Sequence, residues 1–144
     1  QDASGRPLPG AVAQLDSPAA RAAVRARAGL EIAQADKTFA PRVSIVPVGS
    51  EVQFPNRDTV RHHVFSFSKA KTFEIKLYTG TPANPVRFDR PGIVVLGCNI
   101  HDTMVAWVVV VETPWAALGD ALGQVRLGDV PAGSYTLRVW HPDL

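Results

Sequence analysis

From about residue 36 onward, short runs rich in Val, Ile and Phe alternate with Pro, Gly, Asn and Asp, and no helical period competes with them. Runs of this length and spacing are typical of antiparallel β-sandwiches. The predicted strands are Val43–Val46, Glu51–Phe54, His62–Phe67, Phe73–Leu77, Val86–Asp89, Gly92–Leu96 and Ala106–Glu112. The last run holds consecutive valines from Val108 to Val111, which suits a strand covered on both faces. The pattern therefore predicts an all-β fold.

The two ends of the chain have a different texture. A short alternating run at Ala11–Leu15 suits an edge strand. One helix is predicted after it, with Ser17 as the cap, Pro18 in the first position, a helix-favouring run at Ala19–Ala28 and Gly29 at the end. The tail is predicted to form two more strands, Gln124–Leu127 and Tyr135–Trp140.

Composition and charge narrow the class of protein. With 144 residues, 46% of them hydrophobic and 19% charged, the chain is long enough for one medium globular domain but not for a multidomain enzyme. The net charge of +2 is too small and dispersed to favour nucleic acid or an anionic membrane. No apolar run reaches the ~20 residues of a membrane span. The sequence starts at Gln1 without an apolar signal core, so we expect an exported chain whose signal peptide has been removed.

Side chains that can bind a soft metal gather in two short segments. The chain has 4 histidines, 1 cysteine and 1 methionine. His62 and His63 are adjacent, and Cys98, His101 and Met104 follow together further along the chain. A thiolate, two imidazoles and a weak thioether are the donors of mononuclear blue copper sites. Zinc fits less well, because structural zinc sites need cysteine pairs that this chain lacks.

These residues resemble the cupredoxins, and most closely the amicyanin and plastocyanin group. The resemblance covers roughly residues 39 to 112. It rests on Phe39-x-Pro41, Gly49-x-x-Val52-x-Phe54-x-Asn56, Pro91-Gly92 and the short Cys98-x2-His101-x2-Met104 loop. The longer pattern, ending at Trp140-His141-Pro142, resembles bacterial exported proteins labelled methylamine utilization proteins.

The resemblance implies copper ligands His62, Cys98, His101 and Met104, with Asn56 supporting the thiolate from outside the ligand set. The upstream histidine is an open choice between neighbours. Strand alternation favours His63, which shares a face with the phenylalanines of its strand. The spacing from Asn56 favours His62, and a β-bulge at a strand end can reset the alternation. We expect His62 to be the ligand.

The fold implied is a Greek-key, cupredoxin-like β-sandwich with flanking β segments and one short N-terminal helix. We expect a copper domain at residues 36–113. Residues 1–35 and 114–144 resemble parts of a carboxypeptidase-regulatory-like β module, and we expect them to pack on the sandwich edge or to pair with each other.

The expected function is periplasmic transfer of single electrons between redox partner proteins through one copper ion that cycles between Cu(II) and Cu(I). No residue is placed as a nucleophile, and copper oxidases need further histidines for a second centre, so we expect no enzyme activity. The alternatives are copper delivery, storage or sensing without redox turnover, and a β interaction module that has lost its metal. Soft ligands serve both transport and redox, so the sequence leaves this choice open.

Overall fold

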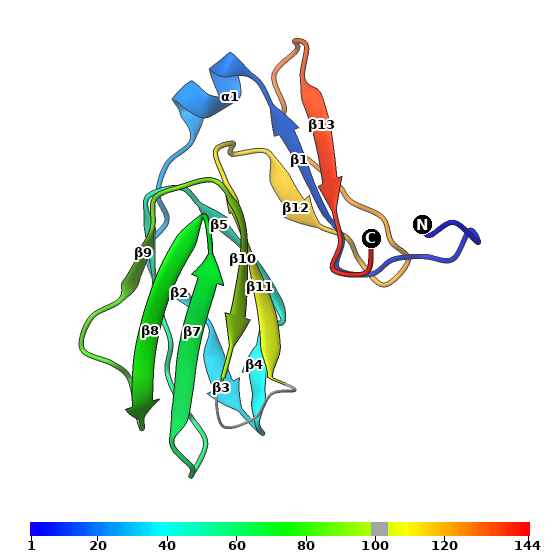
Figure 1. Cartoon of the computed structure of the whole chain (residues 1–144). Helices are drawn as coiled ribbons and strands as arrows, with labels where there is room; N and C mark the ends of the chain where they lie inside the picture. The colour runs from blue at the N-terminus through cyan, green and yellow to red at the C-terminus, as the bar shows by residue number, and fades with distance from the viewer. Residues whose placement is uncertain (99–103) are drawn as a thin grey trace. The chain divides into compact units, whose positions relative to one another are not determined.

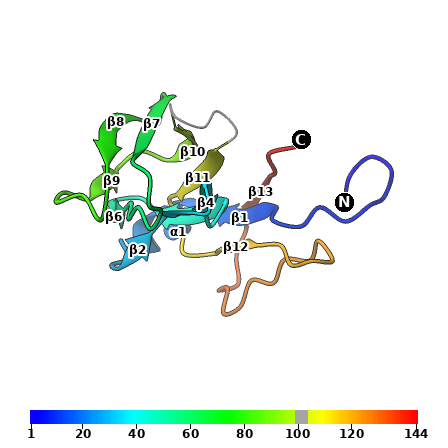
Figure 2. The ribbon, with the colours of Figure 1, turned by 90° about the horizontal axis from the view of Figure 1, so that it is seen from below.

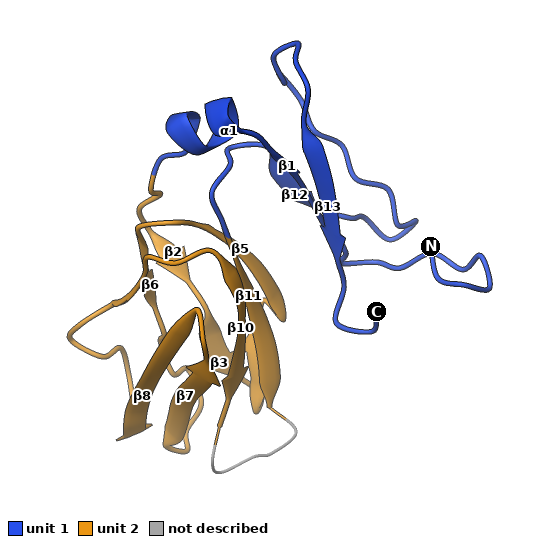
Figure 3. Ribbon diagram, turned by 45° about the horizontal axis from the view of Figure 1, so that its top comes forward, with its two compact units in different colours: residues 1–25, 111–144 blue, residues 26–110 orange. Residues whose placement is uncertain are grey.

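The computed structural model describes residues 1–98 and 104–144. The chain divides into two compact units, which are described separately (Figure 3). Unit 1 consists of Gln1–Arg25 and Val111–Leu144, and unit 2 is Ala26–Val110. Within the described ranges, no helix has the length and apolar character of a membrane-crossing segment.

Unit 2 contains a five-stranded sheet that carries most of the predicted strands (Figure 1). Its order is β5-β11-β10-β7-β8. The bounds are β5 Val43–Pro47, β7 His62–Ser68, β8 Lys71–Tyr78, β10 Gly92–Gly97 and β11 Val105–Val111. The pairs β7–β8, β7–β10 and β10–β11 are antiparallel.

A second sheet of unit 2 has the order β2-β6-β9, with β2 Leu30–Glu31, β6 Ser50–Gln53 and β9 Val86–Phe88. The chain passes from β5 to β6, returns for β7 and β8, crosses again to β9 and returns for β10 and β11. Figure 2 shows β7 and β8 on one side of unit 2 and β2 and β6 on the other. This arrangement confirms the predicted β-sandwich.

Alternation along the strands buries one face of each sheet between the two layers. Val52 and Phe88 from the smaller sheet pack in one cluster with Val64 and Leu96 from the larger one, and all four side chains are 0% exposed. The same cluster includes Cys98 and Met104, so both sulfur atoms belong to residues at the edge of the core.

A hairpin not expected from the sequence joins the two layers at the end where β7 begins. Its strands are β3 Ala33–Ala35 and β4 Thr38–Ala40, and Asp36 and Lys37 form its two-residue turn. Both turn residues have positive φ, 52° and 57°, as a type I′ turn requires. The strands are too short for the alternation pattern to reveal them.

Unit 1 is a sheet of order β12-β1-β13 with one helix. The bounds are β1 Val12–Asp16, α1 Pro18–Ala23, β12 Ala116–Leu118 and β13 Thr136–Trp140. β1 pairs with β12 and β13, so the first and last segments of the chain pair with each other.

Two predictions for the chain ends were wrong, one in where the helix ends and one in the existence of a strand. The helix begins as predicted, with the Ser17 side chain accepting a hydrogen bond from the Ala20 N–H at 3.0 Å, but it ends at Ala23 instead of Ala28. Val24 is already extended, and the Arg27 N–H donates to Ser50 of β6. The predicted strand Gln124–Leu127 is absent, and β12 pairs with β1 instead.

Unit 2 begins at Ala26, earlier than the predicted limit of residue 36. The reason is β2, which pairs in parallel with β6 through Leu30↔Val52 and Glu31↔Gln53. The β2 segment therefore completes the smaller sheet of the sandwich.

Candidate metal centre

Cys98 and His62 meet at the end of unit 2 where β10 ends and β7 begins. The Cys98 Sγ lies 3.7 Å from His62 Nδ1. His62 is 0% exposed and Cys98 is 4% exposed. A thiol and an imidazole from strands far apart in sequence therefore face each other in a site shielded from water.

The other ring nitrogen of His62 is held by a carboxylate. His62 Nε2 lies 2.6 Å from Asp58 Oδ2. A carboxylate only accepts hydrogen bonds, so Nε2 donates, and in the neutral ring Nδ1 carries the lone pair directed at Cys98. Burial acts to raise the pKa of Asp58, but the hydrogen bonds from His62 and from the backbone N–H groups of Lys37 and Asp36 outweigh it and hold the pKa below its ordinary value.

Met104 and His101 are the other two predicted ligands. Met104 is 2% exposed and lines the same hollow as Cys98. His101 lies outside the described residues, which end at Cys98 and resume at Met104. Among the residues that are described, no group of three or more His, Cys, Asp or Glu side chains forms a possible metal cluster.

His63 is directed away from the core face. Its Nε2 lies 3.4 Å from Glu74 Oε2, and its ring meets Phe65 edge-on with centroids 5.9 Å apart. The buried face of β7 carries His62, Val64 and Ser66, whereas Phe67, on the face of His63, is 74% exposed. The register with β8 shifts between His62 and Val64, as in a β-bulge. The fully buried face of β7 is therefore the one that carries His62, and not the face of the phenylalanines that strand alternation had favoured, although His63 itself is only 6% exposed.

Asn56 ties together the loop that leads into β7. Its side-chain amide donates to the carbonyl groups of Val60 (2.9 Å) and Tyr78 (2.8 Å), and its side-chain oxygen accepts from the Asp58 N–H (3.0 Å). Its backbone N–H donates to Gly80. Asn56 thus fixes the path of residues 56–62. It thereby positions Asp58 and His62 so that their side chains meet.

Tyr78 is a buried phenol beside this loop. Its hydroxyl lies 2.8 Å from both Gln34 Oε1 and the Phe54 carbonyl oxygen. Burial raises the pKa of Tyr78 well above its ordinary value, and the negative charge of a nearby Cys98 thiolate raises it further. The hydroxyl is therefore held in its protonated form.

We expect the metal-free protein to lose stability as the pH rises above the ordinary tyrosine pKa of 10.0, because the unfolded chain then releases a proton that folded Tyr78 retains. Tyr78→Phe should abolish this component of the alkaline loss, at a cost of about 1–3 kcal/mol at neutral pH for the acceptors left without a donor. Denaturant unfolding at several pH values measures it. Tyr135→Phe, which removes a hydroxyl that donates to Pro131, is the matched control and should keep the loss.

A hollow of about 380 Å³ borders the centre on the outer face of the larger sheet. It is lined by Phe65, Val95, Leu96, Gly97, Cys98, Met104 and Val105. The Phe65 ring lies over Gly97, where an added Cβ would stand 2.8 Å from the ring. The residue next to Cys98 is therefore closely covered by an aromatic side chain.

Gly97→Ala should destabilise the metal-free protein by about 1–3 kcal/mol, because the Phe65 ring must move to admit the methyl group. Gly128→Ala is the control, since an added Cβ there meets nothing within 4 Å. Denaturant unfolding of both variants measures the difference. Equal stabilities would show that the ring yields freely.

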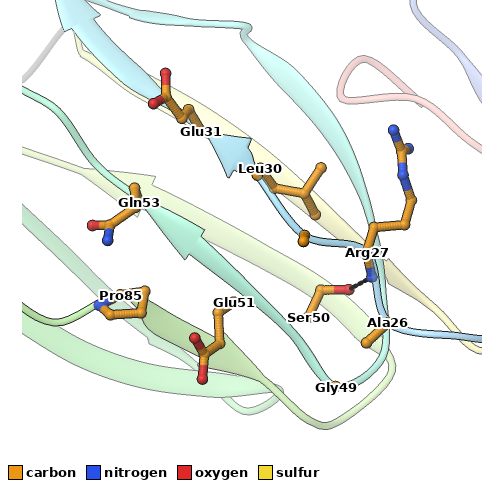
Figure 4. A pocket seen from close by; sticks show the side chains of 11 residues that line it. Ala26, Arg27, Leu30, Glu31, Gly49, Ser50, Glu51, Gln53 and Pro85 are labelled. Carbon is orange, nitrogen blue, oxygen red and sulfur yellow. Dashed lines mark hydrogen bonds between the residues drawn. The ribbon is translucent and has the colours of Figure 1, made fainter.

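A separate hollow of about 430 Å³ lies along β2 and β6 (Figure 4). Its wall includes the side chains of Glu31, Glu51 and Gln53, and the Ser50 hydroxyl accepts from the Arg27 N–H at 2.9 Å. The carboxylates lie apart along the strands in Figure 4, and the lining contains no histidine, cysteine or methionine. This hollow therefore offers no ligands for a soft metal ion.

The separation of the Cys98 and His62 donors fits two ligands of one ion. A first-row metal bound at about 2.3 Å to sulfur and about 2.0 Å to nitrogen, with a trigonal angle between them, separates the two donors by about 3.7 Å. The observed distance between Sγ and Nδ1 is 3.7 Å. The Cys98 and His62 donors therefore fit two ligands of one first-row metal ion, as the predicted copper site requires.

No family model and no curated protein matches the chain. Solved structures do match. A mutant of amicyanin in its reduced Cu(I) form at pH 4 is 22% identical with a TM-score of 0.53, over 69% of this chain and 98% of that chain. A novel purple cupredoxin from Nitrosopumilus maritimus is 21% identical with a TM-score of 0.50, over 58% of this chain and 100% of that one.

A copper-containing nitrite reductase (NirK) from Thermus scotoductus SA-01 matches at 23% identity and a TM-score of 0.53. The match covers 64% of this chain but only 26% of the reductase. At these identities the likeness concerns the fold, and it confirms the predicted cupredoxin-like sandwich.

Proposed function

We propose, from the premise that this chain has the cupredoxin fold, that it carries single electrons by means of one copper ion held by His62, Cys98, His101 and Met104. The observation that supports this most strongly is the buried 3.7 Å approach of Cys98 Sγ to His62 Nδ1. When bound, copper supplies a couple between Cu(II) and Cu(I) that takes up or releases one electron.

The surrounding structure holds three of the proposed ligands, His62, Cys98 and Met104, in buried positions. Cys98 and Met104 stand at the two ends of the ligand loop, directly after β10 and directly before β11, and both are buried. His62 is fixed from the other side by Asp58 at the start of β7. Buried donors that are held in this way need little rearrangement when the charge of the metal changes, which favours rapid electron transfer.

We propose that the protein is an electron carrier rather than an enzyme. The chain matches only a part of the copper-containing nitrite reductase, and of its 4 histidines two are assigned to the proposed site. The remaining two are His63, which lies beside Glu74, and His141, whose Nε2 donates to the Pro9 carbonyl at 3.0 Å. Neither provides a second copper centre.

We propose redox partner proteins and a periplasmic location because the sequence resembles exported cupredoxins. Fractionation of the native host, followed by detection of the chain in the periplasmic extract, tests the location. Recovery only from the cytoplasm would contradict it.

A copper titration of the metal-free protein tests the function. We expect binding of a single equivalent of Cu(II), an intense visible band from thiolate-to-copper charge transfer, loss of the band with a one-electron reductant, and its recovery on reoxidation. Colourless Cu(I) that is passed rapidly to a chelator, without a reversible potential, would instead support delivery. Binding of no copper would contradict both functions.

A further inference from the structure

The geometry points to Asp58 as a positioning residue that fixes the ring of His62 and biases the site toward oxidised copper. This inference rests on the proposed function, but its geometric part concerns the protein without metal. Asp58 Oδ2 lies 2.6 Å from His62 Nε2, and the two side chains are 13% and 0% exposed. No feature of the sequence pattern singled out this aspartate.

The carboxylate is itself held in place by the hairpin turn between β3 and β4. Asp58 Oδ1 accepts from the Asp36 N–H at 2.6 Å, and Oδ2 accepts from the Lys37 N–H at 2.9 Å. The left-handed conformation of both turn residues directs these N–H groups to one point. The β3–β4 hairpin therefore presents two backbone N–H donors to the Asp58 carboxylate.

The loop is also fixed at its base. The Asp58 N–H donates to the Asn56 side chain at 3.0 Å, and Asn56 is bonded in turn to Val60 and Tyr78. Asp58 is thus held through its backbone and through both carboxylate oxygens. Its hydrogen bond with His62 has little freedom to rotate or lengthen.

Two effects on the site follow. Because the carboxylate only accepts, it keeps the proton of the neutral ring on Nε2 and leaves Nδ1 as the donor atom toward Cys98. Because the carboxylate is an anion, it increases the electron donation of the imidazole, which favours Cu(II) over Cu(I). Asp58 should therefore lower the reduction potential of the bound copper.

A second carboxylate–histidine pair on β7 and β8 provides a control. Glu74 Oε2 lies 3.4 Å from His63 Nε2, and the Glu74 side chain is 39% exposed. The distance between the two side chains is longer than in the Asp58–His62 pair, and the carboxylate is more exposed to solvent. His63 is also not a proposed ligand. Glu74→Gln therefore removes a charge beside a histidine without touching the proposed site.

Asp58→Asn keeps the size of the side chain but removes its charge. Whichever way the amide is turned, its NH2 group replaces an oxygen that accepts from Asp36 or from Lys37 and His62. In the metal-free full chain, nitrogen NMR at a pH above the ordinary histidine pKa should show the His62 proton on Nε2 in wild type and in Glu74→Gln. A mixture of the two tautomers is expected in Asp58→Asn.

With copper, Asp58→Asn should retain a single equivalent but lose about 10–100-fold in Cu(II) affinity, with a smaller loss for Cu(I) and so a higher potential. Glu74→Gln should match wild type. An unchanged tautomer in Asp58→Asn, or equal losses for Cu(II) and Cu(I), would overturn the inference. If the wild type binds no copper, the proposed function fails, and the NMR result alone decides whether Asp58 positions His62.

Discussion

Cys98→Ser is expected to abolish the intense visible absorption of the copper-loaded protein, because the charge-transfer band arises from the thiolate and serine provides none. The sandwich should remain folded, since Cys98 is one of many residues in its core cluster. Placing a hydroxyl in this buried position costs about 1–3 kcal/mol where it is not hydrogen-bonded. Absorption spectra and far-UV circular dichroism measure the two effects.

Copper should also stop stabilising this variant. For the wild type, a free copper concentration of about 100 times the dissociation constant adds about 2.7 kcal/mol to the free energy of unfolding, because the ion binds the native state. In Cys98→Ser the melting temperature should hardly respond to the same concentration. A variant that keeps its colour, or a wild type that shows no shift, would contradict the assignment of Cys98 as a ligand.

His62→Ala is expected to open the site and to lower copper affinity strongly, whereas His63→Ala should retain a single equivalent of coloured copper. The reason is that His62 Nδ1 is 3.7 Å from Cys98 Sγ, while His63 lies beside Glu74. Removal of His62 also leaves Asp58 without its imidazole partner. Copper stoichiometry and spectra of the two alanine variants distinguish the neighbours.

His141→Ala serves as the control for loss of a histidine. Its ring accepts from the Asp143 N–H at 3.0 Å through Nδ1 and lies 3.0 Å from the Pro9 carbonyl through Nε2. Both nitrogens are thus engaged within unit 1, and copper binding should be unchanged. If His63→Ala loses copper and His62→Ala keeps it, strand alternation was the better guide to the ligand.

The longer strands of the sandwich could be predicted because their burial follows the alternation of side chains. β10, for example, buries Val94 and Leu96, and its limits differ from the prediction by a single residue. The short strands β2, β3 and β4 could not, because two or three residues carry no period. Their pairing depends on partners elsewhere in the chain, such as Val52 for Leu30.

The sequence could predict those residues of the site whose side chains are rare in this chain. Cysteine and methionine are so scarce here that Cys98 and Met104 stood out beside a histidine. Asp58 did not, because one aspartate among 13 acidic residues has no distinguishing pattern. Only the fold shows that the Asp36–Lys37 turn and the start of β7 converge on its carboxylate.

X-ray absorption at the copper edge, on wild-type protein loaded with a single equivalent and measured in both oxidation states, tests whether one thiolate, two imidazoles and a thioether hold the copper ion. We expect one short sulfur ligand from the Cys98 thiolate, imidazole nitrogens, and a longer, weaker contact to the Met104 sulfur, in Cu(II) and Cu(I) alike, because His62, Cys98 and Met104 are buried and held in place. A copper ion bound only by nitrogen and oxygen, or a ligand set that changes on reduction, would contradict this expectation.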